Sequence, residues 1–292
     1  MRRRWLPAAP RIPLVPTLTP DARCEPECSM PLPHQHQLSR RFKKYPWRCL
    51  IGSIVLLASI SPACVPSKPP PGVVRFEPEN FPDSVEGPMP HFGPFDSRFD
   101  ALLAACPLIL SQPHATAGRM NDPNFAVRWR ISNEYCAWLY YTPDNKYEMS
   151  LLVESTERIP PGNQGERWCR APAFVNDPRY PRRSLQYLYF LHNHAAVPTN
   201  ISDRDIRAVV KSALIHGKFV ETREGRIPVA VIAFISNSYE PSPNTCDGFY
   251  EYSWGSTEAV KWTPDEHGTW HKKKVGSVTW INETEFRFER SE

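Results

Sequence analysis

The spacing of apolar residues predicts two amphipathic helices. The first is expected over residues 96–110, where Asp96 can cap the helix. Its apolar face would consist of Phe99, Leu102, Leu103 and Cys106. The second is expected over residues 203–215 and would end at Gly217. Its inward face would consist of Ile206, Val209, Val210 and Ala213.

Other stretches have the alternating or continuous apolar pattern of β-strands. Residues 125–131 alternate, and residues 185–191 predict a strand that leads directly into His192. Residues 228–236 are almost wholly apolar, which is typical of a central strand. Further strands are expected at 134–141, 147–154, 249–255, 258–262 and 275–288. Residues 157–183 are expected to be a long loop, and the whole predicts an α/β (mixed α+β) fold around one sheet.

Residues 1–64 have the pattern of a leader with a signal peptide. A basic stretch precedes residues 50–60, an uncharged apolar run that is too short to span a bilayer. Residues 61–64, Ser-Pro-Ala-Cys, resemble a bacterial lipobox, in which the cysteine is lipidated after cleavage. We therefore expect a membrane anchor at Cys64 and a location in the bacterial cell envelope, outside the cytoplasmic membrane. Secretion without an anchor is the alternative.

Proline is dense immediately after this leader. Residues 65–95 contain nine prolines, a density that predicts an extended tether without regular structure. The folded domain is then expected over residues 96–292, a length sufficient for one sizeable core.

The distribution of charge argues against a nucleic-acid partner. The formal net charge of the 292 residues is +4, but residues 1–50 hold 10 Lys or Arg against 3 Asp or Glu. Residues 64–292 hold 25 basic and 28 acidic side chains, a net of −3. The basic character therefore belongs to the leader rather than to the predicted domain.

Cysteine usage agrees with export. Four of the eight cysteines fall in the predicted domain, namely Cys106, Cys136, Cys169 and Cys246. An even number in an exported protein predicts two disulfides. Four cysteines allow three pairings, and the sequence does not choose among them.

Four polar residues after the strand at 185–191 suggest a metal site. His192, His194, Ser202 and Asp205 form the pattern H-x-H-x₇-S-x-x-D. Residues two apart on a strand share one face, so the two imidazoles can point to one position, and Asp205 could join them from the following helix. Two histidines and a carboxylate are a known ligand set of catalytic zinc. Ser202-x-x-Asp205 is also a plausible helix-capping arrangement.

This pattern resembles the metal-binding signature of the JAMM/MPN⁺ metalloproteases. The resemblance covers about residues 96–240 and implies a single JAMM/MPN-like domain with a curved mixed sheet flanked by helices. It further implies that His192, His194 and Asp205 bind Zn²⁺ and that Ser202 helps to stabilise the oxyanion.

The resemblance also implies a glutamate as general base at the start of an early strand, in the pattern E-x-x-G-x-L. Glu134 opens such a segment, with Ala137 in place of the glycine, and Glu148 opens a second one. Glu134 is preferred because it opens the first of two adjacent apolar runs. A further departure is Ala195, where the family commonly has proline.

The predicted function is that of a zinc-dependent metallopeptidase or isopeptidase, which hydrolyses amide bonds of a peptide or protein substrate in the cell envelope. The alternative is a non-catalytic binding or scaffold lipoprotein on the same fold. A third possibility is a disulfide-braced envelope protein in which the His-x-His pattern is incidental.

Overall fold

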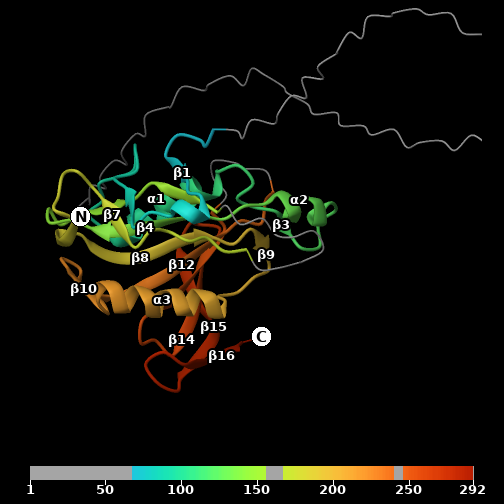
Figure 1. The fold of residues 1–292 in the computed structure, drawn as a ribbon. Coiled ribbons are helices and arrows are strands. Elements are labelled where there is room, and N and C mark those ends of the chain that lie inside the picture. Colours follow the sequence, from blue (N-terminus) through green and yellow to red (C-terminus); the bar gives the residue numbers. More distant parts are fainter. Residues whose placement is uncertain (1–67, 156–166, 240–245, 292) are drawn as a thin grey trace, which may run out of the picture. The chain divides into compact units, whose positions relative to one another are not determined.

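The computed structural model describes residues 68–155, 167–239 and 246–291, and its main feature is a mixed sheet of ten strands (Figure 1). The strands lie in the order β1 (Val73–Arg75), β6 (Leu152–Glu154), β4 (Tyr135–Tyr141), β8 (Gln186–Asn193), β12 (Ala230–Ile235), β13 (Gly248–Ser253), β14 (Glu258–Pro264), β15 (Trp270–Trp280) and β16 (Phe286–Arg290), with β5 (Tyr147–Met149) beside β4. The pairs β1–β6 and β8–β12 are parallel, and the other pairs are antiparallel.

Helices and short strand pairs complete the described part of the chain. The α-helices are α1 (Arg98–Leu110), α2 (Phe125–Ile131) and α3 (Asp203–His216). The short pairs are β2 (Ser84–Glu86) with β7 (Phe174–Asn176), β3 (Gly118–Arg119) with β9 (Ala196–Val197), and β10 (Phe219–Thr222) with β11 (Gly225–Pro228). Two 3₁₀ turns are η1 (Pro78–Asn80) and η2 (Arg182–Ser184). This mixture confirms the predicted mixed α/β class.

The predicted leader, including Cys64, lies outside the described residues. Within the described ranges, no helix has both the length and the apolar character needed to cross a membrane.

The two faces of the central strands pack against different helices. The register pairs Trp138 of β4 with Phe190 of β8, so these side chains share one face. α3 covers this face, where the ring of His216 lies 5.3 Å from that of Trp138, centroid to centroid. The opposite face carries Tyr189, whose hydroxyl accepts a hydrogen bond from Arg98 of α1 at 3.1 Å. α1 and α3 therefore cover opposite faces of the sheet (Figure 1).

The centre of the sheet is β12, as its apolar sequence predicts. All its residues are buried, and it lies between β8 and β13. Full burial of a side chain such as Ile232 or Phe234 stabilises the fold by about 1.5–3 kcal/mol. This rigid strand also supports β8, whose end carries the two histidines of the predicted site.

Residues 125–131 form the helix α2, so the predicted strand is wrong there. None of the α2 residues is buried, and no neighbouring strand pairs with them among the described residues. The apolar residues that suggested alternation also have helical spacing, because the Phe125 and Trp129 rings stack at 6.0 Å one turn apart. Without a sheet partner, local helical hydrogen bonding prevails.

The proline-rich segment does not form the predicted structureless tether; from residue 68 onward it belongs to the fold. β1 pairs with β6 and β2 pairs with β7, while Met89 and Phe92 are buried in the core. The prolines lie outside these two three-residue strands, so the backbone N–H groups needed for pairing are retained. The folded unit therefore begins well before residue 96.

Several predicted element boundaries also change. Residues 147–154 form two strands rather than one, because the Ser150 hydroxyl accepts a hydrogen bond from the Trp138 N–H and interrupts the ladder. The predicted strand at 275–288 is the end of β15 and the start of β16, joined by a turn. Ser97, rather than Asp96, caps α1 by accepting from the Asp100 N–H at 3.3 Å. Part of the predicted loop at 157–183 is strand β7.

The structure contains two disulfides, which form one of the three pairings that the sequence left open. Cys106 of α1 is joined to Cys246, and Cys136 of β4 is joined to Cys169. Loops of 140 and 33 residues are closed, which in a chain-entropy description stabilises the fold by about 3–5 kcal/mol per bond. Such bonds indicate an oxidising, extracytoplasmic location.

Candidate metal centre

The end of β8 presents two imidazoles on one face. His192 and His194 flank Asn193, whose side chain points to the opposite face and is fully buried. There the Asn193 carboxamide accepts from the Tyr135 N–H at 2.7 Å and donates to the Ala115 carbonyl at 2.6 Å. These hydrogen bonds fix the backbone between the two histidines, so both rings are held toward the same side.

The first turn of α3 places the carboxylate of Asp205. Ser202 and Asp205 form a capping box, in which the Ser202 hydroxyl accepts from the Asp205 N–H at 3.2 Å. In return, Oδ2 of Asp205 accepts from the Ser202 N–H and from the Ser202 hydroxyl, each at 2.8 Å. The capping box therefore also positions the carboxylate that is the predicted ligand, so the two interpretations of the Ser202–Asp205 spacing do not exclude each other.

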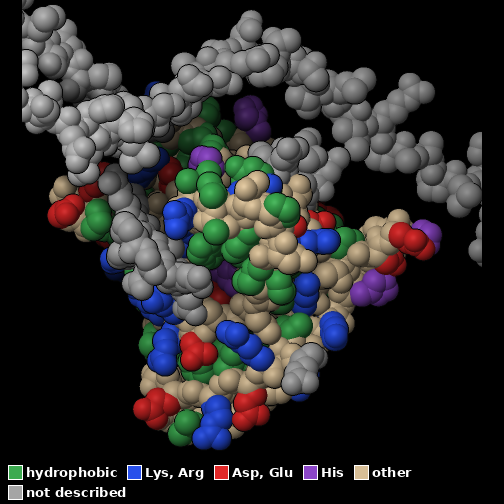
Figure 2. Space-filling model, turned by 90° about the vertical axis from the view of Figure 1, so that its right-hand side faces the viewer, with side chains coloured by type: hydrophobic (Ala, Val, Ile, Leu, Met, Phe, Trp, Pro, Cys, Tyr) green, Lys and Arg blue, Asp and Glu red, His purple; other side chains and the backbone are tan. Residues whose placement is uncertain are grey.

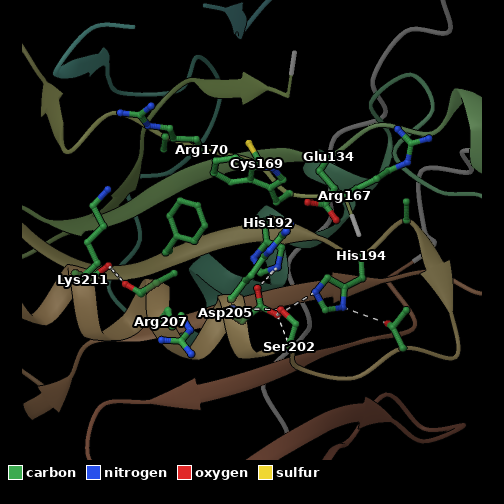
Figure 3. A pocket seen from close by; sticks show the side chains of 18 of the residues that line it. Glu134, Arg167, Cys169, Arg170, His192, His194, Ser202, Asp205, Arg207 and Lys211 are labelled. Carbon is green, nitrogen blue, oxygen red and sulfur yellow. Dashed lines mark hydrogen bonds and ion pairs between the residues drawn. The ribbon is translucent and has the colours of Figure 1, made fainter. Parts of the chain in front are cut away.

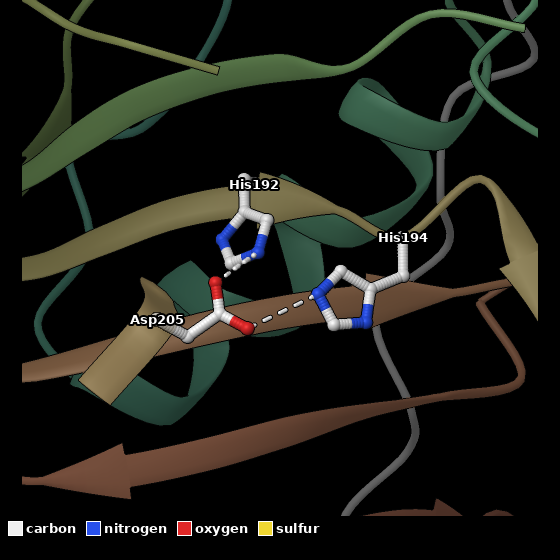
Figure 4. Close-up of side chains that lie close together, drawn as sticks. All are labelled: His192, His194 and Asp205. Atoms are coloured by element: carbon white, nitrogen blue, oxygen red, sulfur yellow. Dashed lines mark ion pairs between the residues drawn. The ribbon is translucent and has the colours of Figure 1, made fainter. Parts of the chain in front are cut away.

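His192, His194 and Asp205 converge (Figure 4). Nε2 of His192 lies 3.1 Å from Oδ1 of Asp205, and Nε2 of His194 lies 3.4 Å from Oδ2. Nitrogen and oxygen ligands of tetrahedral zinc, at bond lengths of 2.0–2.2 Å, are about 3.4 Å apart. One ligand atom from each of the three residues lies within 4.8 Å of the others, so the group could hold a metal ion.

Burial prepares these groups to act as ligands. Their side chains are 5%, 11% and 12% exposed for His192, His194 and Asp205. Burial lowers the pKa of His192 even though Asp205 opposes this, so the ring stays neutral near pH 7 and keeps a lone pair. Burial alone would raise the pKa of Asp205, but the two histidines hold it well below its usual value.

Thr199 orients the second imidazole. Nδ1 of His194 lies 3.2 Å from the Thr199 hydroxyl, which leaves Nε2 directed at Asp205. Metal-binding histidines commonly use their second nitrogen in this way. The sequence analysis did not identify Thr199. Its position in the sequence, between the H-x-H part of the pattern and the S-x-x-D part, could have indicated that Thr199 lies near the site.

The two glutamates considered as the general base lie in different places. Glu134 directly precedes β4 and lines the same cavity as the three converging side chains (Figure 3). Burial raises its pKa to about 8, although His194 and Arg167 act in the opposite direction. Glu148 lies beside the far end of β4 and forms an ion pair with Arg179 at 2.9 Å. Glu148 is not among the residues that line the cavity.

One cavity of about 930 Å³ gathers the residues predicted from the sequence. Its lining includes Glu134, His192, His194, Ser202 and Asp205. Apolar and aromatic side chains form much of the remaining wall, among them Trp138 and Phe190. Figure 2 shows hydrophobic side chains gathered near the middle of one face, with Lys and Arg side chains on both sides of them.

The same wall contains several arginines and one lysine that the sequence analysis did not connect to the site. Arg204, Arg207 and Lys211 follow one another on α3 at spacings of three and four residues, which was the signal available in the sequence. Arg167 and Arg170 lie within the predicted loop at 157–183, and only the tertiary fold brings them to the cavity.

Comparisons with protein families, with curated proteins and with solved structures give no match to this chain. The chemistry of the site is therefore inferred from its own residues.

Proposed function

We propose that this protein is a zinc-dependent hydrolase of amide bonds, a metallopeptidase or isopeptidase with a site of the JAMM/MPN⁺ type. The observation that carries the proposal is the convergence of His192, His194 and Asp205 in a cavity that also contains Glu134. Zn²⁺ is the proposed cofactor because two imidazoles and one carboxylate leave a fourth position open.

In this proposal the three ligand side chains hold the ion, and other residues handle protons and charge. When bound, zinc would polarise a carbonyl group and make a water molecule more acidic. The Glu134 carboxylate would accept a proton from the attacking water and deliver it to the departing nitrogen. A pKa of about 8 suits this role, because the carboxyl group can both take up and release a proton near neutral pH.

Ser202 is the proposed donor to the oxyanion. Its hydroxyl group donates to Oδ2 of Asp205 in the present arrangement. To stabilise a developing negative charge on the substrate, it would have to exchange this hydrogen bond for one to the carbonyl oxygen. The backbone N–H of Ser202 also reaches Asp205, so the carboxylate keeps a hydrogen bond during this exchange.

The location outside the cytoplasm limits the substrate to peptides or proteins found there. We further propose that the chain is a lipoprotein of the bacterial envelope, anchored through Cys64. The signal-like residues 50–60 and the lipobox-like residues 61–64 support this part of the proposal.

The metal content of the exported full-length protein tests the proposal. We expect about one zinc ion per chain, lost in His192→Ala and in Asp205→Ala. His271→Ala is the matched control, because this histidine lies on β15 and does not line the cavity. A folded wild-type protein that remains free of zinc when the ion is supplied would contradict the proposal.

A non-catalytic binding or scaffold lipoprotein is the second candidate. The observation in its favour is that Asp205 already pairs with both imidazoles and with Ser202, so its carboxylate is satisfied by the protein's own groups. Peptide hydrolysis separates the two candidates: the enzyme loses activity in Glu134→Gln while retaining zinc, whereas the scaffold has no activity to lose.

A further inference from the structure

Most of the charged side chains that line the cavity beside the proposed metal site are positive. Its cationic side chains are Arg167, Arg170, Arg204, Arg207, Lys211 and Arg290. Its acidic side chains are Asp83, Glu134 and Asp205. Asp83 pairs with Arg182, and the other two belong to the proposed catalytic site. Positive charge is thus in excess around the apolar part of the cavity.

Four of these cations are available to a ligand. Within the described ranges, Arg170, Arg207, Lys211 and Arg290 form no ion pair with a carboxylate, and all four are exposed. The Arg170 guanidinium lies 4.2 Å from the centroid of the Phe81 ring, and that of Arg207 lies 5.3 Å from the Phe286 ring. Stacking on a ring restrains a guanidinium while leaving its N–H groups free to bind an anion.

The positions of these cations follow from the geometry of α3. Residues four apart lie on the same side of a helix, which places Arg207 and Lys211 in one row on the cavity side. A rise of about 1.5 Å per residue puts Lys211 about 9 Å along the helix axis from Asp205. Arg170 lies across the cavity from this row (Figure 3). Trp138 and Phe190 add apolar surface to the lining of the same cavity.

We infer that the cavity binds an acidic peptide, with side-chain carboxylates within about three residues of the scissile amide. An extended peptide advances about 3.3 Å per residue, so three residues span the distance between Asp205 and Lys211 along α3. The apolar part of the cavity lining suits the side chains and backbone between the carboxylates. This inference names the substrate class of the proposed hydrolase and therefore rests on the proposed function.

A peptide fits these observations better than a nucleic acid does. The net charge of residues 64–292 is −3, so acidic side chains outnumber basic ones in this part of the chain and its overall charge does not favour an extended basic surface. Binding of a nucleic acid through its phosphates relies on such an extended basic surface.

The test uses pairs of fluorescence-quenched peptides that differ only in having Glu or Gln within three residues of the cleavable bond. With the exported full-length protein, we expect kcat/KM for the Glu peptides to exceed that for the Gln peptides by about tenfold. Arg207→Gln combined with Lys211→Gln should reduce the ratio of kcat/KM for the Glu peptides to that for the Gln peptides to below about threefold, and an unchanged ratio would contradict the role given to these two cations. Lys273→Gln combined with Arg287→Gln is the matched control, because neither residue lines the cavity.

Binding of the same peptides, measured by fluorescence anisotropy, tests the preference for acidic ligands separately from the proposed peptidase activity. Binding that prefers Glu and is lost in the Arg207/Lys211 variant, without hydrolysis, would uphold the acidic ligand and refute the peptidase. Equal binding and equal cleavage of the Glu and Gln peptides would overturn the acidic ligand and leave the hydrolase standing. Tighter binding of a ten-nucleotide oligothymidylate than of the Glu peptides, lost in the same variant, would overturn the peptide assignment in favour of a nucleic acid.

Discussion

A buried glutamate lies beside each end of β4, Glu134 just before the strand and Glu148 on the neighbouring β5, yet the surroundings of the two carboxylates differ. Glu134 and Glu148 are 5% and 2% exposed, and burial raises the pKa of both. Arg179 neutralises Glu148 and also binds Asp177 at 2.7 Å, whereas Glu134 faces a cavity shared with His194. A buried carboxylate therefore indicates chemistry only when its neighbours leave it facing a space that substrate can occupy.

Replacing each glutamate by glutamine in turn tests whether the two carboxylates have different roles. In Glu134→Gln we expect kcat for peptide cleavage to fall by about 10²–10⁴-fold, the usual contribution of a general acid–base group. Zinc content and thermal stability should stay close to wild type, since the amide is similar in size and forms no new unpaired charge. A loss of less than threefold in kcat would remove Glu134 from the mechanism.

A smaller effect is expected from the residue that orients His194. Thr199→Val removes the hydroxyl at 3.2 Å from Nδ1 and keeps the shape of the side chain. Loss of such an outer hydrogen bond commonly weakens metal affinity by about 10–100-fold. Competition with a chelator of known affinity measures the change. Thr279→Val on β15, outside the cavity lining, is the control, and equal zinc affinities in the two variants would contradict the role given to Thr199.

At the other end of β4, removal of the charge should affect stability instead of catalysis. Glu148→Gln leaves Arg179 with only Asp177 as an anionic partner and should lower the free energy of unfolding by about 1–2 kcal/mol. This range takes account of Arg179 being 41% exposed. Urea denaturation measures the loss, and kcat should remain within about twofold of wild type. A strong loss of activity with unchanged stability would reverse the assignment of the two glutamates.

An effect of similar size, confined to acidic pH, is expected from a histidine near the Glu148 end. His216 packs between Trp138, Phe174 and Tyr187, and burial lowers its pKa to about 4. The unfolded chain binds a proton at a pKa of about 6.5, so between these two values the unfolded state holds more protons and folding stability falls as the pH falls. With partial exposure considered, we expect a loss of about 1–2 kcal/mol between pH 6.5 and pH 4.

Replacement of this ring isolates its contribution. His216→Phe keeps an aromatic side chain in the stack but removes the titrating group, so the decline in stability over this range should be shallower than in wild type. Parallel urea curves at several pH values measure the difference. An unchanged pH dependence would assign the decline to other groups.

Local sequence patterns predicted the elements that carry the site, because their geometry depends on neighbouring residues. The apolar run before His192 gives β8, and alternation along that strand places His192 and His194 on one face. The Ser202–Asp205 spacing gives a capping box, which positions the carboxylate through contacts within one helical turn. The structure brings these predicted ligand side chains together, although the bound ion itself is still a prediction.

The features that the sequence did not predict depend on contacts between distant segments. Residues 125–131 had the pattern of a strand, but only the tertiary fold shows that no strand of the described part of the chain lies beside them to pair with. The pairing of β1 with β6 joins segments about eighty residues apart, which proline content alone does not reveal. The arginines after residue 166 reach the cavity through the bond between Cys136 and Cys169, a pairing that spacing did not determine.

The Cys136–Cys169 bond has a consequence for when the protein can act. Cys136 lies opposite His192 in the sheet, and Cys169 lies between Trp168 and Arg170 in the cavity lining. A newly made chain in a reducing compartment lacks this crosslink, so the segment that bears the cationic wall is not yet fastened beside the histidines. Maturation of the cavity is thus coupled to arrival in an oxidising environment, which is also where we propose that its substrates are found.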